Sequence, residues 1–158
     1  MTLTRWWQLL GLCFCLVFVV ACGATAENEV VQTAAYEGVI FHQDNAQEQD
    51  ALRGFITDYE DYRTLLNEDI PELESHLLIH MQGSYPDIAA KLDQYQRQYI
   101  GFWQQGKLYA FVNAFCDPLN VAWHSQVVMV NDGGDCYFTT VYDMTEGTFA
   151  QTLVNGES

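Results

Sequence analysis

The spacing of apolar residues changes from a helical period to a strand period near Gly101. Before this point, Leu73, Leu77 and Met81 recur every four residues, which is the spacing of one face of a helix. Beyond it, residues 107–115 alternate small aliphatic side chains with aromatic or amide ones, which is typical of a strand. The sequence therefore predicts a helical half followed by a sheet-like half.

Turn residues divide both halves into short elements. Glycine-containing turns at residues 104–107, 132–135 and 146–147 bound apolar runs that we expect to be strands, at residues 107–115, 127–130, 136–142 and 148–154. Helices are expected at residues 57–66, 69–83 and from about 86 onward. A chain of 158 residues has the length of one domain. We therefore predict an α+β fold, in which two to three helices precede a four- to five-stranded antiparallel meander and pack on one face of its sheet.

The N-terminus carries a separate pattern. Arg5 precedes an uncharged, apolar run over residues 9–21. A helix that spans a bilayer needs about 20 apolar residues, so this shorter run is typical of a signal peptide. An ordinary secretory signal of this kind would leave the following Cys22 unmodified.

The end of this run, Val19-Val20-Ala21-Cys22, resembles the lipobox of bacterial lipoproteins. The resemblance implies cleavage between Ala21 and Cys22, a diacylglyceryl group on the Cys22 sulfur and an acyl group on its new amine. It also implies a protein of the bacterial cell envelope, attached to the membrane through these acyl chains. Gly23, in the place where Asp favours the inner membrane, indicates the outer membrane in a cell with two membranes.

The predicted organisation is therefore a signal peptide at 1–21, the lipidated cysteine with a flexible tether at 22–35, and a single domain at 36–158. The domain also resembles uncharacterised small lipoproteins of bacterial envelopes, a resemblance that implies no activity. It rests on residues 95–101 (YQRQYIG), 113–116 (NAFC), Trp123, 132–138 (DGGDCYF) and 155–156 (NG).

The composition is strongly acidic. Six Lys and Arg oppose 21 Asp and Glu, for a formal net charge of −15, and cleavage before Cys22 would remove only the cation Arg5. Nucleic-acid binding requires clustered cations, so no nucleic acid is expected as a partner. An envelope protein or a cell-wall component is the expected partner, and the acidity suits a basic one.

Two cysteines, Cys116 and Cys136, remain after the signal is removed and Cys22 is lipidated. An even pair in an exported protein favours a disulfide. The alternative hypothesis makes Cys116 a nucleophile with His124 as its base, because a thiolate needs a proton acceptor nearby.

A metal site is a further hypothesis. Glu72, His76 and His80 share one stripe of the second predicted helix, and imidazole and carboxylate groups are Zn²⁺ ligands. The alternative is a polar helix flank, and the metalloprotease motif HExxH is absent because Leu77 replaces its glutamate. Residues 132–135 (DGGD) likewise suit Ca²⁺ or, more simply, a tight turn.

These patterns together favour a lipid-anchored envelope protein that acts as a binding or structural module without catalysis. The alternative is an envelope hydrolase that uses Cys116 and His124, or a metal at Glu72, His76 and His80. No cofactor is predicted. The aromatic residues of the sheet-like half are assigned to the core, with an exposed partner surface as the alternative.

Overall fold

A computed structural model describes residues 26–156, apart from the side chains of Ala51 and Gln151. The predicted signal peptide and the lipobox cysteine Cys22 therefore lie outside the described residues. Among the residues that are described, no helix has the length and apolar character needed to cross a bilayer.

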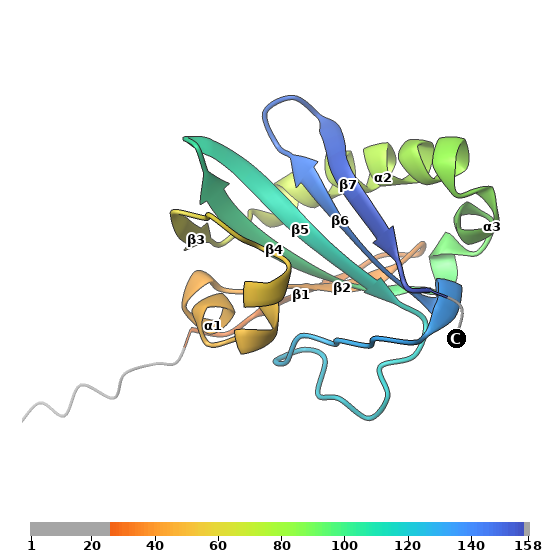
Figure 1. The fold of residues 1–158 in the computed structure, drawn as a ribbon, viewed down its shortest axis with the longest axis horizontal. Helices are drawn as coiled ribbons and strands as arrows, with labels where there is room; N and C mark the ends of the chain where they lie inside the picture. Colours follow the sequence, from red (N-terminus) through yellow and green to blue (C-terminus); the bar gives the residue numbers. More distant parts are fainter. Residues whose placement is uncertain (1–25, 157–158) are drawn as a thin grey trace, which may run out of the picture.

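Seven strands form one mixed sheet (Figure 1). Six of them follow the order β1 (Glu29–Gln32), β2 (Glu37–Ile40), β4 (Gln96–Gln104), β5 (Lys107–Phe115), β6 (Tyr137–Asp143) and β7 (Thr148–Val154). The seventh, β3 (Asp61–Arg63), pairs with the second half of β4, next to the half that pairs with β2. The β2–β4 pair is parallel and the other pairs are antiparallel.

The helices are short except for one. They are α1 (Gln43–Gln47), α2 (Ile70–Ser84) and α3 (Pro86–Ala89), with single 3₁₀ turns η1 (Asp50–Gly54), η2 (Asn67–Asp69), η3 (Leu92–Gln94) and η4 (Gly134–Cys136). Helices α2 and α3 lie on one face of the sheet, whereas α1, η1 and the loop of residues 117–133 lie on the other (Figure 1). The predicted helix at 69–83 corresponds to α2.

The predicted arrangement of helices followed by an antiparallel meander, with helices on one sheet face, is wrong. Strands β1, β2 and β3 precede α2, the sheet is mixed, and both of its faces are covered. The segment 57–66 holds β3 in place of a helix, and residues 127–130 belong to the covering loop in place of a strand. Residues 29–32, inside the predicted tether, form β1, so the folded domain begins earlier than predicted.

The third predicted helix fails for a physical reason. Ile88, Leu92, Tyr95 and Tyr99 recur at helical spacing, but the chain forms a short helix and then enters β4 at Gln96. Strand β4 is buried on both faces over most of its length, so its residues do not alternate between apolar and polar. A strand of this kind cannot be told from a buried helix by periodicity alone.

Two hydrophobic cores lie on opposite sides of the sheet. On one side, Leu73, Leu77 and Met81 of α2 pack against the sheet. On the other side, Phe111 of β5 belongs to a second core with residues of η1 and β3, and Phe115 packs against the covering loop. Both phenylalanines are almost fully buried, which places them in the core and not on an exposed partner surface.

Two buried amide side chains hold the covering loop on this second face. Gln98 donates to the carbonyl oxygens of Trp123 and Gln126, at 2.6 and 2.7 Å, and its own oxygen accepts from the Val128 amide at 2.9 Å. Asn113 donates to the oxygens of Gln98 and Val128, at 2.9 and 2.7 Å. These two side chains therefore make the hydrogen bonds to the loop backbone that a neighbouring strand would make in a sheet.

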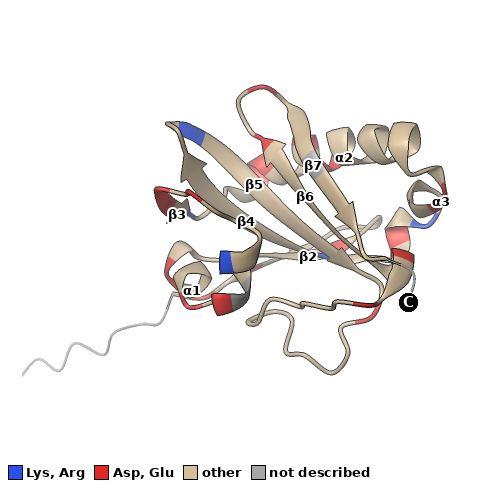
Figure 2. Ribbon diagram, in the orientation of Figure 1, with Lys and Arg blue, Asp and Glu red and all other residues tan. Residues whose placement is uncertain are grey.

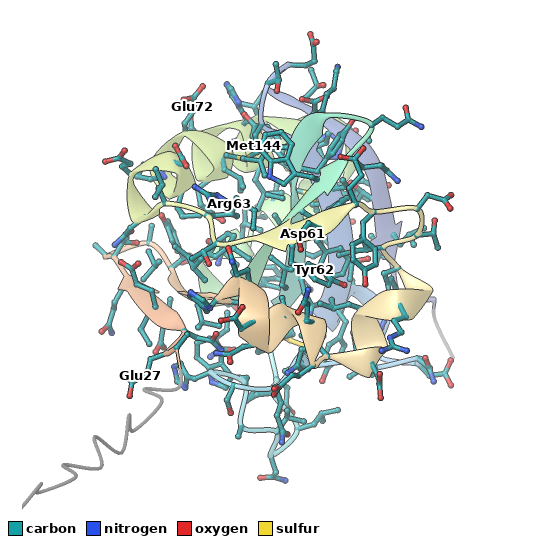
Figure 3. All side chains as sticks on the ribbon, turned by 90° about the vertical axis from the view of Figure 1, so that its left-hand side faces the viewer. Glu27, Asp61, Tyr62, Arg63, Glu72 and Met144 are labelled. Carbon is teal, nitrogen blue, oxygen red and sulfur yellow. A yellow bond between two sulfur atoms is a disulfide. The ribbon has the colours of Figure 1, made fainter. Side chains whose placement is uncertain are left out.

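Gly101 is required by the close approach of β3 to β4. It pairs with Arg63, and a methyl group at this position would collide with the Arg63 carbonyl oxygen and with Leu65 (Figure 3 shows β3). We expect Gly101→Ala to lower the free energy of unfolding by about 1–3 kcal/mol, because backbone and packed side chains would have to move. Urea unfolding measures this loss. The matched control is Gly83→Ala in α2, where the added methyl meets open space, and equal unfolding midpoints for the two variants would refute the explanation.

Candidate functional site

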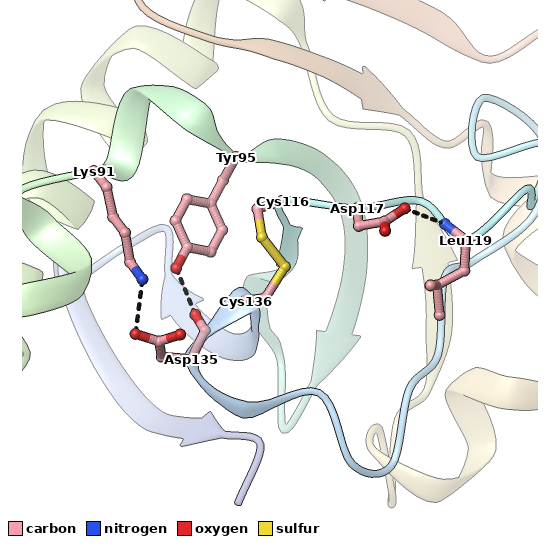
Figure 4. Close-up of a disulfide and its surroundings, with 7 residues drawn as sticks. All are labelled: Lys91, Tyr95, Cys116, Asp117, Leu119, Asp135 and Cys136. Carbon is pink, nitrogen blue, oxygen red and sulfur yellow. Dashed lines mark hydrogen bonds and ion pairs between the residues drawn. A yellow bond between two sulfur atoms is a disulfide. The ribbon is translucent and has the colours of Figure 1, made fainter. Parts of the chain in front are cut away.

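The structure joins Cys116 and Cys136 in a disulfide, with their Cα atoms 5.2 Å apart (Figure 4). Strands β5 and β6 are direct neighbours, and the pairing of Phe115 with Tyr137 brings the two cysteines together at the same end. The Cys116 amide also donates to the Cys136 carbonyl at 3.0 Å. The predicted pairing of these cysteines is confirmed.

The disulfide bears on the nucleophile hypothesis. A sulfur that is bonded to a second sulfur carries no thiolate, so Cys116 has no nucleophilic group in this state. His124 has different neighbours: its ring stacks on Trp123, with centroids 3.8 Å apart, and its Nε2 lies 3.6 Å from Glu37 Oε1. The described structure therefore does not assemble a cysteine–histidine pair at Cys116.

The 132–135 turn lies beside the disulfide (Figure 4). Lys91 Nζ donates to the Asp135 carboxylate at 2.7 Å, and the Tyr95 hydroxyl donates to the Asp135 carbonyl. Asp135 is thereby paired with a lysine. The two hydrogen bonds connect η4, which contains Asp135, to the residues on either side of η3.

His76 and His80 face the β6–β7 hairpin from α2. His76 Nδ1 lies 2.5 Å from the Tyr142 hydroxyl, and His80 Nε2 lies 2.8 Å from Thr152 Oγ1. The two rings border a shallow groove of about 300 Å³ together with Ile79 and Phe149. Within residues 26–156, no cluster of three or more His, Cys, Asp or Glu side chains is arranged to hold a metal ion, so Glu72, His76 and His80 do not form one.

The contact of His80 with the hairpin predicts a dependence of stability on pH. Burial lowers the pKa of His80 from its usual value, so the unfolded chain takes up a proton at a higher pH than the folded one. The free energy of unfolding should therefore decline as the pH falls below about 6.5, the ordinary pKa of histidine. Urea unfolding between pH 7.5 and pH 5 measures the decline, and His80→Gln should flatten it. A decline of the same size in His80→Gln would assign it to other groups.

The surface around these elements is acidic. Five lysines and arginines lie within residues 26–156, and Figure 2 shows them in isolated positions. Four of them, Arg53, Lys91, Arg97 and Lys107, lie within ion-pair distance of a carboxylate. The remaining carboxylates leave the domain with a strongly negative surface, which favours basic partners.

A cleft of about 450 Å³ opens between the turn joining β1 to β2, helix α2, and the segment of α3 and η3. Its walls are largely apolar, with contributions from Tyr36, Pro71, Leu78, Ala89 and Ala90. Leu78 is 41% exposed and adds apolar surface to the cleft wall. Glu74 and Arg97 also line this cleft, although both side chains are buried.

Arg97 is fixed by three neighbours. Its Nη1 donates to the Tyr95 carbonyl at 2.5 Å and its Nη2 donates to the Leu92 carbonyl at 2.9 Å. Its Nε lies 2.9 Å from Glu74 Oε1, as an ion pair in which the Nε–H does not point along a hydrogen bond. This arrangement holds a buried cation at the end of η3, where the Leu92 carbonyl also accepts from the Tyr95 amide at 3.3 Å.

Two tyrosines complete the cluster around Arg97 and Glu74. The Tyr99 hydroxyl donates to Glu74 Oε1 at 2.7 Å, and the Tyr36 ring lies 5.0 Å from Arg97 Cζ in a cation–π contact. Burial raises the pKa of Glu74, an effect that Arg97 and the Tyr99 hydroxyl oppose. Burial also raises the pKa of Tyr99 well above its usual value and that of Tyr36, so both phenols keep their protons at neutral pH.

None of these four residues was a predicted site residue, although one signal was present. Glu74 lies on the same stripe of α2 as Ile70, Leu77 and Met81, all of which are buried. An acidic residue on an apolar stripe indicates a buried charge that needs a partner. The partner Arg97 lies on another element, and its sequence neighbourhood gives no sign of the pairing.

Compared with known protein families, with curated proteins and with solved structures, the chain shows no match. The role proposed below for the cleft is therefore argued from its residues and their contacts alone.

Proposed function

We propose that this chain is a lipid-anchored protein of the bacterial cell envelope, attached through acyl chains on Cys22, whose folded domain binds a partner without catalysis. The lipobox-like sequence ending at Cys22 supports the anchor. The Cys116–Cys136 disulfide supports export, because disulfides persist in oxidising compartments. For a cell with two membranes we propose the outer membrane, on the basis of Gly23.

The observation that carries the binding role is the Arg97–Glu74 ion pair, buried along a cleft that is open to solvent. Removing two charges from water costs several kcal/mol per ion, and apolar residues of similar volume would avoid this cost. A few converging polar groups within an apolar cleft are typical of binding sites. We therefore assign binding to the cleft bounded by Tyr36, Leu78 and Ala90.

The neighbourhoods of the other candidates support a role without catalysis. The Cys116 sulfur is held in the disulfide, and His76 and His80 each contact a hydroxyl group of the β6–β7 hairpin. The two phenols of the Arg97 cluster, Tyr36 and Tyr99, keep their protons at neutral pH because burial raises their pKa, which suits recognition more than proton transfer.

The anchor is tested by expressing the full-length chain and its Cys22→Ala variant in bacteria supplied with labelled palmitate. The proposal expects label and membrane association for the parent chain and neither for the variant. A parent chain without label, or a variant that stays labelled, would contradict the anchor.

The binding role is tested in cells by placing a photoreactive phenylalanine analogue at Ala90, in the wall of the cleft, and at Thr145, an exposed residue of the β6–β7 turn. A defined adduct is expected from Ala90 and not from Thr145. It should be lost when Leu78→Asp places a charge on the cleft wall. Identical adduct patterns from the two positions would contradict a binding role for this cleft.

A further inference from the structure

We infer, given the proposed lipidation of Cys22, that one defined face of the domain rests on the headgroup layer of the membrane and that the Arg97 cleft points away from it. This face, called the anchor face below, is formed by residues 26–28, 45, 48–49 and 124–125. It surrounds a shallow polar hollow of about 410 Å³.

The point where the chain enters the fold is fixed by side-chain hydrogen bonds. Asn45 Nδ2 donates to the Ala26 carbonyl and to Asn28 Oδ1, each at 2.8 Å. Asn28 Oδ1 also accepts from the His42 amide at 2.9 Å, and Asn28 Nδ2 donates to the His124 carbonyl at 2.9 Å. These bonds tie the entry segment to α1 and to the covering loop, so the attachment point has a set position on the domain.

The chain between Cys22 and this attachment point is short. Four residue steps lead from Cys22 to Ala26, and they span at most about 14 Å however they are arranged. The tether predicted for residues 23–35 would have spanned about 20 Å on average, but β1 occupies part of it. A cysteine whose acyl chains lie in the bilayer therefore keeps residues 26–28 within reach of the headgroup layer, which is about 5–8 Å thick on each side.

The cleft lies at the other end of the sheet. Strand β1 leads from the anchor face to the turn that precedes Tyr36, and the five residue steps from Asn28 to Thr33 extend about 17 Å at the rise of a strand. The pairing of Glu37 with Gln96 places the start of β4, and with it Arg97, at that same far end. Figure 1 shows β1 and β2 running from the side of the fold near α1 towards the side where α3 lies.

The charge of the anchor face selects the kind of lipid. Glu27 and Glu48 line the hollow and are exposed. At a Debye length of about 8 Å they repel anionic phosphates and attract the ammonium groups of zwitterionic headgroups. The inferred occupant of this face is thus a layer of zwitterionic phospholipid.

Fluorescence quenching tests the orientation. The full-length chain is produced with its own signal, purified from membranes and reconstituted into phosphatidylcholine vesicles that contain a headgroup spin-labelled lipid. A fluorophore is attached at Ser125→Cys on the anchor face or at Ser84→Cys at the end of α2. Both serines are exposed, and Cys116 and Cys136 are bonded to each other. We expect quenching at position 125 to exceed that at position 84 at least twofold.

Two controls make the test specific. Inserting ten Gly and Ser residues after Gly23 should reduce quenching at position 125 towards that at position 84, because the longer linker lets the domain move away from the membrane and rotate. Replacing a third of the phosphatidylcholine with phosphatidylglycerol should also reduce it. Equal quenching at both positions in a protein whose mass shows lipidation would overturn the orientation alone. A protein that is not lipidated and does not float with the vesicles would overturn the anchor as well.

Discussion

Replacing Arg97 with methionine will lower the free energy of unfolding by about 3–5 kcal/mol. The side chain is only 2% exposed, and its removal leaves the Glu74 carboxylate buried without its cation. The Tyr95 carbonyl also loses its Arg97 donor, and the Leu92 carbonyl loses one of its two donors. Urea unfolding of the purified mature protein measures the loss.

A second variant separates the ion pair from simple packing. Adding Glu74→Leu to Arg97→Met removes the unpaired charge and restores apolar contact, so the double variant should be more stable than Arg97→Met alone. The expected recovery is about 1–3 kcal/mol, and the Tyr99 hydroxyl, which then lacks its acceptor, limits it. If the loss of stability in the double variant equals the sum of the losses in Arg97→Met and Glu74→Leu, the two charges do not act as a pair.

Replacing Gln98 with leucine will destabilise the protein by about 3 kcal/mol and will release the covering loop. The buried Gln98 amide holds the carbonyls of Trp123 and Gln126 and the amide of Val128, and each orphaned group costs about 1–3 kcal/mol. Amide hydrogen exchange at Val128 should accelerate more than the loss of global stability explains.

The matched control for this variant is Gln104→Leu on the same strand. Gln104 makes one hydrogen bond from its side chain, to the Thr57 carbonyl at 2.7 Å, at an exposed site. We expect a loss below about 1 kcal/mol and unchanged exchange at Val128. If Gln98→Leu left the Val128 amide as protected as in the parent, the loop would be held by its apolar contacts and not by the two amides.

The elements that the sequence predicts well are those whose residue types recur with a regular period. Helix α2 buries one stripe, so its apolar residues recur about every 3.6 residues. Strand β5 is buried on both faces from Ala110 to Phe115, but its small aliphatic residues lie on one face and its aromatic and amide residues on the other, so residue types still alternate along it. Strand β4 is buried on both sides and gives no such signal. Its parallel pairing with β2 joins residues about 60 positions apart, and no local pattern encodes it.

The candidate site was predictable only in part. The disulfide followed from the number of cysteines, whereas its geometry became clear once β5 and β6 proved to be direct neighbours. His76 and His80 do share one side of α2, but hydroxyl groups of β6 and β7 take the place expected for a metal. Glu74 was detectable as a charge on an apolar stripe, and Arg97 was not, because their contact depends on tertiary structure.

The intact mass of the mature protein, extracted from bacterial membranes, tests the lipid anchor most directly. We expect a chain that begins at Cys22 and is heavier than residues 22–158 by a diacylglyceryl group and one further acyl chain, with Cys116 and Cys136 two hydrogens short of the reduced state. A chain that begins at another residue, or one that carries an unmodified Cys22, would contradict the lipid anchor and the orientation that depends on it.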